Sequence, residues 1–489
     1  MRKIPILLVG IILLGILLRV YNFPFRYGLG EETVRDAVIG IQAARDIQLP
    51  FTGAFSSLGP FTFGPMYAYQ LAFATYILPT NYAPWIYLTL LSIAYIPVMY
   101  KIGEKLYGKI YGLLLAFLVA ISPTQIISGT HLTSHNVTNI FAAGALLLFI
   151  IIIKQKKSTW WNFFLGVTIG IGISLHFQMI GLLFFPLVLL LKQRKVSGFL
   201  SSAVGVFITF LPYIFFELNN HWFNTRNIIH FLLYDKQKIA VPNRWLTYLF
   251  DFWPKFWGDA LGIPSVFAFG IMTVFAVLIA YLFIKKKINK VFLIIILSFI
   301  LNFVLLRYYF GPRFFGYLNY LRPYIFLFTA FPLHYLWSGK KKFGKVLVIM
   351  MLILLVFFPI KRIQLESKKD GLTIQMYEIN SLIEKQTHNN PYTVYSCPRL
   401  DYDGNYNGKL LSMSFIADMK KGYARTPIGI VDQSCDIVAG TKLLGSKYGL
   451  RIVDLSSTSS ASLEKLGWKQ VTFSSIYNGY AKWWVILKP

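Results

Sequence analysis

The chain has few charged residues, and acidic residues are the scarcest. Of its 489 residues only 14% are charged, with 20 Asp or Glu against 48 Lys or Arg. A soluble protein would carry about 25% charged residues. Instead, 56% of the residues are hydrophobic, and many apolar runs reach the ~17–25 residues that cross a bilayer. This composition excludes an ordinary soluble enzyme and predicts an α-helical polytopic membrane protein.

The excess of basic residues does not indicate a nucleic-acid partner. The formal charge is +28, but the basic residues stand in short clusters between apolar runs, such as Lys285–Lys290 and Lys340–Lys342. This is the positive-inside pattern that orients membrane proteins. We therefore expect these basic residues to lie at the membrane surface, and we expect no nucleic-acid partner.

Cysteine is nearly absent, and no cleavage site follows the first apolar run. The two cysteines, Cys397 and Cys435, both lie in the C-terminal part, where an outside location would permit a disulfide but would not require one. The run Ile6–Val20 is followed by Tyr21 and Asn22 rather than by small residues. We interpret it as a retained first helix and not as a signal peptide.

About eleven transmembrane helices account for the apolar runs, because every lysine cluster between helices then falls on one side. The N-terminus is predicted inside, the protein in the cell (plasma) membrane, and residues 361–489 outside. Two helical pieces, Glu32–Ile47 and Pro65–Leu78, are expected in the first outer loop, with the second lying in the interface. Residues 1–360 would form the membrane domain.

Residues 361–489 are more polar and predict a small α/β or α+β extracytoplasmic domain. Short β-type runs alternate there with amphipathic helical ones. The predicted strands are Tyr392–Ser396, Gly429–Val431, Arg451–Val453, Gln470–Phe473 and Trp483–Leu487.

The stretch Gly28–Ala37 concentrates acids in a chain that otherwise avoids them. Only nine acidic residues precede Lys361, and this stretch holds Glu31, Glu32 and Asp36. In a helix, Glu32 and Asp36 would stand one turn apart with Arg35 adjoining. Two such carboxylates can divide the work of a general base, and an arginine can hold a phosphate. The alternative is that acids at a helix start favour the dipole, with Arg35 as their salt-bridge partner.

Three sequence features resemble the GT-C class of polyprenyl-phosphate-sugar glycosyltransferases, in particular the protein mannosyltransferase and aminoarabinose transferase families. These features are Glu32-Thr-Val-Arg-Asp-Ala37, Phe63-Gly-Pro-Met-Tyr67-Ala-Tyr and Lys105-Leu-Tyr-Gly108. The resemblance implies a catalytic carboxylate at Glu32, with Arg35 on the motif arginine. It also implies a second motif of the type K-P-P-L-x-Y, in which Tyr67 would contact substrate.

Four of the departures of this chain from those motifs bear on the chemistry. Glu32 replaces an aspartate, Asp36 an aromatic residue, Phe63 the lysine and Gly64 the first proline. A phosphate contact from the missing lysine must therefore come from elsewhere. The candidates are Arg313, Arg322 and Arg226, each of which could instead be an interfacial anchor. The departures also put an aminoarabinose-specific activity in doubt.

Further polar side chains are predicted on the same outer face. His131, His135 and Asn136 occupy the second outer loop, and His176 and Gln178 lie at the next outer turn. They are candidate substrate contacts, or polar groups that face a watery cavity. His131 and His135 lack the glutamate of a zincin motif, so no metal site is expected, although a divalent metal is possible. The string Asp401-Tyr-Asp403 is explained as well by a turn as by a metal-held nucleotide sugar.

The sequence thus predicts an inverting membrane glycosyltransferase. It would move a monosaccharide from a polyprenyl phosphate to an acceptor protein, lipid or glycan at the outer face. Glu32 would act as general base, assisted by Asp36 and Glu31, and Arg35 would neutralise the leaving phosphate with another arginine. No redox cofactor is expected. A transporter or flippase of a lipid-linked saccharide and a non-catalytic envelope scaffold are the alternatives.

Overall fold

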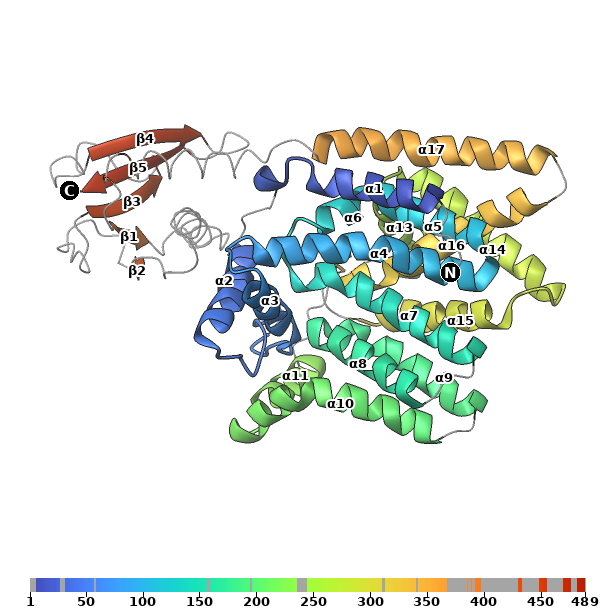
Figure 1. Ribbon diagram of the computed structural model, residues 1–489, viewed down its shortest axis with the longest axis horizontal. Helices are drawn as coiled ribbons and strands as arrows, with labels where there is room; N and C mark the ends of the chain where they lie inside the picture. Colours follow the sequence, from blue (N-terminus) through green and yellow to red (C-terminus); the bar gives the residue numbers. More distant parts are fainter. Residues whose placement is uncertain are drawn as a thin grey trace. The chain divides into compact units, whose positions relative to one another are not determined.

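The structure, a computed structural model, describes most of the first 366 residues and five strands beyond them. The described ranges are 6–26, 31–56, 59–155, 159–193, 196–234, 244–309, 313–339 and 342–366, with residues 385, 388 and the strands given below. The chain forms two compact units (Figure 1), each described by itself. Unit 1 comprises Met1–Tyr21, Leu49–Gln70 and Tyr87–Ser367, and unit 2 comprises Asn22–Gln48, Leu71–Ile86 and Lys368–Pro489.

A helix stands at each of the eleven positions where a membrane helix is predicted. They are α1 (Ile6–Val20), α4 (Ala83–Tyr107), α5 (Lys109–Ile121), α7 (Thr138–Gln155), α8 (Thr159–Leu175), α9 (Phe184–Gln193), α10 (Val196–Asn219), α14 (Ser265–Ile284), α15 (Lys290–Arg307), α16 (Arg322–Ser338) and α17 (Lys342–Glu366). Many of them run side by side, for example α8 and α10 (Figure 1).

Six of the described helical stretches are long and apolar enough to cross a membrane. They are α4, α10, α14, α15, Lys342–Gln364 of α17 and the stretch Ser134–Gln155, which contains α7. Four shorter apolar helical stretches, Ile6–Val20, Lys109–Ile121, Thr159–Leu175 and Phe177–Lys192, accompany them. The chain is a polytopic helical membrane protein, while eleven crossings and the orientation of the termini remain predictions.

Two predicted helices are interrupted at one end. The prediction Ile110–Ile127 divides into α5 and α6 (Pro123–Ser128), because Pro123 cannot continue a helix and Ser122 caps the new one. The hydroxyl of Ser122 accepts from the backbone N–H of Gln125 at 3.3 Å. The prediction Met179–Leu191 begins instead with a 3₁₀ segment, η3 (Phe177–Leu183), before α9.

Close helix packing in unit 1 depends on small residues. A Cβ atom at Gly166 on α8 would lie 2.0 Å from the carbonyl oxygen of Ser202 on α10. A Cβ atom at Gly205 would lie 2.4 Å from the carbonyl oxygen of Phe163. Such glycines let two backbones approach in the way that membrane helices favour. The core of unit 1 is elsewhere aromatic, as in the stacked pair Phe275 and Phe328, whose centroids are 4.5 Å apart.

Shorter elements connect the long helices and carry most of the polar side chains. They are α2 (Glu31–Asp46), α3 (Met66–Ile77), α11 (Phe223–Leu233), α12 (Arg244–Thr247), α13 (Trp253–Leu261), the 3₁₀ segments η1 (Phe23–Phe25), η2 (Ser134–Val137) and η5 (Phe315–Leu321), and the π-helical turn η4 (Tyr248–Phe252). The predicted loop helices Glu32–Ile47 and Pro65–Leu78 thus form as α2 and α3.

Unit 1 has two chemically different ends. At one end, which we call the Arg322 end, the hydroxyl of Ser122 donates to the carbonyl of Ala260, and Met66 N–H donates to the hydroxyl of Ser174 at 3.2 Å. At the other, the lysine end, the ammonium of Lys154 donates to the carbonyl of Lys105. The varied polar side chains of unit 1 that are described below lie at the Arg322 end.

Five strands follow in unit 2 and lie at the predicted positions. They are β1 (Tyr392–Ser396), β2 (Ile430–Asp432), β3 (Tyr448–Asp454), β4 (Lys469–Ser475) and β5 (Lys482–Lys488). They form one mixed sheet in the order β2-β1-β3-β5-β4, with β1 parallel to β2 and β3, and β5 antiparallel to β3 and β4. Cys397, Cys435 and Asp401–Asp403 lie outside the described residues, and an extracytoplasmic domain remains a prediction.

Candidate functional site

The acidic stretch forms the first turns of α2 in unit 2. Glu32 is exposed and Asp36 is buried, although the two residues are one helical turn apart. Arg35 pairs with Asp36, with its Nη2 2.8 Å and its Nε 2.9 Å from Oδ1. The side chain of Glu31 lies outside the described part of the structure. The arginine therefore binds the second carboxylate, and the first one faces outward.

Asp36 has an unusual affinity for its proton. Burial raises the pKa of its carboxyl from 3.8 to about 6, the nearby Arg35 opposes that shift, and the charge of Glu32 adds to it. A desolvated carboxylate binds a proton more tightly than one in water. Residues with such shifts gather at functional sites, although structural ion pairs produce them too.

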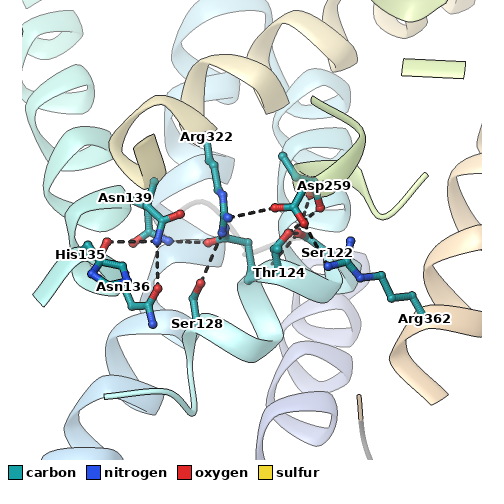
Figure 2. Close-up of polar contacts among 12 residues, drawn as sticks. Ser122, Thr124, Ser128, His135, Asn136, Asn139, Asp259, Arg322 and Arg362 are labelled. Atoms are coloured by element: carbon teal, nitrogen blue, oxygen red, sulfur yellow. Dashed lines mark hydrogen bonds and ion pairs between the residues drawn. The ribbon is translucent and has the colours of Figure 1, made fainter. Parts of the chain in front are cut away.

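Arg322 lies at the centre of a buried polar cluster at the Arg322 end of unit 1. Its Nη2 is 3.1 Å from Oδ2 of Asp259, and its Nη1 is 3.3 Å from the hydroxyl of Ser128. Arg362 binds the other oxygen of Asp259 at 3.0 Å. Figure 2 shows Arg322 between Ser128 and Asp259, with Arg362 on the far side of the carboxylate. Arg322 therefore has a carboxylate partner inside the protein, but it shares that carboxylate with Arg362, and its Nε has no hydrogen-bond partner.

The amide side chains next to this cluster form a second set of contacts. Asn319 of η5 donates to the carbonyl of His135 at 3.1 Å and to Oδ1 of Asn136 at 2.9 Å. Asn136 in turn donates to the carbonyl of His131 at 2.7 Å. Three predicted residues, His131, His135 and Asn136, are thus brought together. His131 itself is exposed, and because it precedes η2, the two histidines do not share one helix face.

Arg313 belongs to a different cluster, with Arg307 at the end of α15. Its guanidinium carbon is 4.8 Å from the ring of Tyr248, and that of Arg307 is 4.8 Å from the ring of Trp245. Arg313 also donates to the carbonyl of Arg307 at 3.4 Å. Burial, together with the charges of Arg307 and Arg244, lowers the pKa of Arg313.

The charge of this second cluster is not balanced by the described residues. Each ion pair found among them joins other side chains, and none includes Arg307 or Arg313. Arg307 is only 6% exposed, and its Nε has no hydrogen-bond partner. A buried guanidinium without a counter-ion is costly unless an anion joins it.

His176 stands between two aromatic rings. Its imidazole stacks on Phe63 with centroids 5.4 Å apart, and it lies 4.9 Å from the ring of Tyr317. Burial, and then the nearby His135, lower the pKa of His176 to about 3, so the ring is neutral at physiological pH. Gln178 follows at the start of η3, and its Oε1 is buried without a partner.

The unexpected residues of the second motif have a structural reason. The backbone N–H of Gly64 donates to the carbonyl of Ser174 at 3.0 Å. A Cβ atom at Gly64 would lie 2.1 Å from the hydroxyl of Ser174, which leaves no room for a proline ring. Phe63, at the position of the missing lysine, contributes a ring to His176 instead of a charge. Tyr67 is buried on α3.

No group of three His, Cys, Asp or Glu side chains that could hold a metal ion occurs in the described part of the chain. Four residues of the polar clusters were not predicted as site residues, namely Asp259, Arg307, Asn319 and Arg362. Asp259 could have been noticed as one of nine acids before Lys361. Arg307 could have been noticed as a cation on the predicted outer side, where the positive-inside rule needs none.

Comparisons with known proteins agree with this geometry. Residues 62–216 match the family of dolichyl-phosphate-mannose-protein mannosyltransferases. No curated protein matches the chain in sequence. Among solved structures, ArnT from Cupriavidus metallidurans in the apo state has a TM-score of 0.60 at 10% identity, covering 98% of this chain and 97% of ArnT.

Two further structures carry lipid phosphates. ArnT from Cupriavidus metallidurans bound to undecaprenyl phosphate gives a TM-score of 0.59 at 11% identity, with 98% of this chain and 97% of that chain covered. The oligosaccharyltransferase AglB from Archaeoglobus fulgidus, in complex with an inhibitory peptide and a dolichol-phosphate, gives 0.51 at 14% identity, with 83% and 63% covered. The chain is a membrane protein with the GT-C glycosyltransferase fold, similar over residues 62–216 to the mannosyltransferase family.

Proposed function

We propose that this protein transfers a monosaccharide from a polyprenyl phosphate to an acceptor at the outer face of the membrane, with inversion at the anomeric carbon. The mannosyltransferase family match and the lipid phosphates named for ArnT and AglB support a lipid-linked donor. The acceptor would be a protein, a lipid or a glycan.

The observation that carries this proposal is the uncompensated pair Arg307 and Arg313. A leaving lipid phosphate gains negative charge as the glycosidic bond breaks, and preorganised cations stabilise that charge. Arginine suits this task because its fork of N–H groups matches phosphate oxygens and its charge is permanent. Arg322 is less available because Asp259 and Ser128 already occupy two of its nitrogens.

Glu32 is the better placed of the two acids to act as general base. A base must reach the proton of the acceptor, and the side chain of Glu32 is exposed whereas that of Asp36 is buried. In the reaction, the acceptor oxygen or nitrogen attacks the anomeric carbon, and its proton passes to Glu32. The bond from that carbon to the phosphate oxygen breaks with both electrons on the phosphate. Asp36 would hold Arg35 in place.

The decisive test measures sugar transfer from polyprenyl-phosphate donors in membranes that contain the full chain. Glu32→Gln should lower the rate by about 10²–10⁴-fold, because a positioned base contributes that much. Asp46→Asn is the matched control, since Asp46 is an exposed acid on the same helix, paired with Arg45, and should leave the rate unchanged. Transfer by Glu32→Gln at the wild-type rate would show that another group is the base.

The same membranes separate the other two classes of function. A flippase would move the lipid-linked sugar across the bilayer without forming a new glycoside, and a scaffold would do neither. Wild-type protein that transfers no sugar from any polyprenyl-phosphate donor would refute the glycosyltransferase proposal.

A further inference from the structure

Three side chains at the Arg322 end have hydrogen-bonding atoms for which the described residues supply no partner. His176 is 7% exposed, and its Nδ1 has no partner. The Oε1 of Gln178, two residues later, and the Oδ1 of the fully buried Asn319 have none either. Buried polar atoms in proteins are nearly always paired, so three unpaired atoms in one neighbourhood call for a bound group.

A ring contact links His176 to η5, the segment that also carries Asn319, although the two lie far apart in the sequence. Tyr317 lies 4.9 Å from His176 and 5.8 Å from His135, and it belongs to η5, as does Asn319. Phe63 covers the other face of His176. Aromatic faces beside amide and imidazole groups suit a hydroxyl-bearing ring, which offers both C–H surface and polar edges.

The charge of this neighbourhood does not suit a cationic ligand. Electrostatic interactions link Arg322 to His135 and His135 to His176. No described carboxylate has such an interaction with either imidazole. The carboxylate of Asp259 is bound by two arginines, and that of Glu217 by Asn224 and Thr225. Among the described residues of unit 1, an ammonium group would therefore find no unpaired carboxylate here, and desolvating it would be costly.

We propose that Phe63, His176, Gln178, Tyr317 and Asn319 form a subsite for an uncharged, hydroxyl-bearing sugar ring of the donor, which discriminates against aminosugars. This inference rests on the proposed function, because it assigns the sugar end of a lipid-linked donor. Phe63, which stands in place of the motif lysine, agrees with this inference, because it places an aromatic ring rather than a charge against the neutral His176.

The test measures binding rather than transfer. The full chain in detergent is titrated with a bare polyprenyl phosphate, with the same lipid carrying a neutral hexose, and with the same lipid carrying an amino-deoxypentose. We expect the hexose to tighten binding over the bare lipid by roughly tenfold or more, about the gain from one or two hydrogen bonds. The aminosugar should give no such gain.

Variants test whether the gain in affinity from the hexose depends on the proposed subsite residues. His176→Phe and Gln178→Leu should each remove most of the hexose gain while leaving affinity for the bare lipid unchanged. His334→Phe is the matched control, because His334 also has an unpartnered Nδ1 but lies at the lysine end, beside Tyr107. Gln178→Glu keeps an acceptor oxygen and adds a negative charge, so it should shift preference toward the aminosugar.

The outcomes separate this inference from the proposed function. A hexose gain that vanishes in His176→Phe and Gln178→Leu supports the subsite even if the wild type transfers no sugar. A gain that survives both variants overturns the subsite even if transfer occurs, as does wild-type protein that binds the aminosugar lipid as tightly as the hexose lipid. If both variants fail to fold by thermal unfolding, the donor preference of Gln178→Glu decides, and an unchanged preference overturns the proposal.

Discussion

Arg322 and Arg313 have the same side chain but different electrostatic surroundings. Arg322 shares Asp259 with Arg362, so one carboxylate is enclosed by two cations within the protein. Arg313 and Arg307 lie over aromatic rings, and no described carboxylate pairs with them. The difference shows that burial alone does not identify a ligand-binding arginine. What matters is whether the protein itself supplies the counter-charge.

The largest expected effect is the loss of the shared carboxylate. Asp259→Asn removes the counter-ion of a buried arginine, and breaking such a pair costs about 3–5 kcal/mol. We expect a strong fall in thermal stability in detergent, whatever the effect on transfer. Asp251→Asn is the control, because Asp251 pairs with Lys255 in an exposed position where a pair contributes at most about 1 kcal/mol. Equal stability of Asp259→Asn and Asp251→Asn would contradict the difference between a buried, shared carboxylate and an exposed one.

The Arg35–Asp36 pair extends the comparison to a carboxylate that is itself buried. Its pKa of about 6 lies above the value of 3.8 in an unfolded chain. Folding therefore favours the protonated form of Asp36. Its contribution to the free energy of unfolding is complete below about pH 4 and is lost as the pH rises through about 6. The total change is about 3 kcal/mol.

Melting temperatures measured across pH 4–7 test whether the contribution of Asp36 to stability falls as the pH rises. The wild type should lose stability relative to Asp36→Asn as pH rises through that window. Asp46→Asn should show no such change there, because hydrogen bonding to Arg45 lowers the pKa of Asp46 below 3.8. A difference between wild type and Asp36→Asn that stays constant with pH would show that the carboxyl is not shifted.

Arg313→Gln should impair transfer rather than folding. Removing one cation from the leaving phosphate should slow transfer by about 10²-fold, the lower end of the range for losing a single stabilising donor. Bare polyprenyl phosphate should also bind more weakly. Lys255→Gln is the control, because Lys255 is an exposed cation of unit 1 that already pairs with Asp251, and it should have little effect. If Arg313→Gln retains full activity and lipid affinity, Arg313 is not the phosphate contact.

The smallest effect is expected from the ring beneath Arg307. Trp245→Leu removes a cation–π contact worth about 0.5–1 kcal/mol at an exposed site, so lipid-phosphate affinity should fall by about two- to fivefold. Trp222→Leu serves as control because Trp222 is similarly exposed. An equal loss in both variants would indicate a general effect of tryptophan on membrane contact.

Much of the fold was predictable because local patterns specify it. A helix forms at each of the eleven predicted positions, since long apolar runs bounded by lysine clusters leave few alternatives. The five predicted strands form as well, from β-branched and aromatic runs. The turn at His176 was predicted, whereas the break at Ser122–Pro123 and the 3₁₀ start of the helix after His176 were not, because the apolar pattern continues through both.

The candidate site was predicted only in part. The acidic helix was recognised from its charge. Arg35 was expected to contact the leaving phosphate or, in the alternative, to pair with the acids, and the structure pairs it with Asp36. Among the three candidate phosphate contacts Arg313, Arg322 and Arg226, the structure gives a carboxylate partner, Asp259, to Arg322. Neither Asp259 nor Arg362 could be linked to it, because they are 63 and 40 residues away in the sequence and meet only through packing.

The sequence by itself determined the class of molecule. Composition, apolar run length and the one-sided lysine clusters predict a polytopic membrane protein, and short motifs indicate the GT-C resemblance. The tertiary structure alone decided which polar groups compensate one another and which do not. Charge compensation and unsatisfied hydrogen bonds depend on distances of about 3 Å between side chains from separate helices, and no periodicity along one helix records those distances.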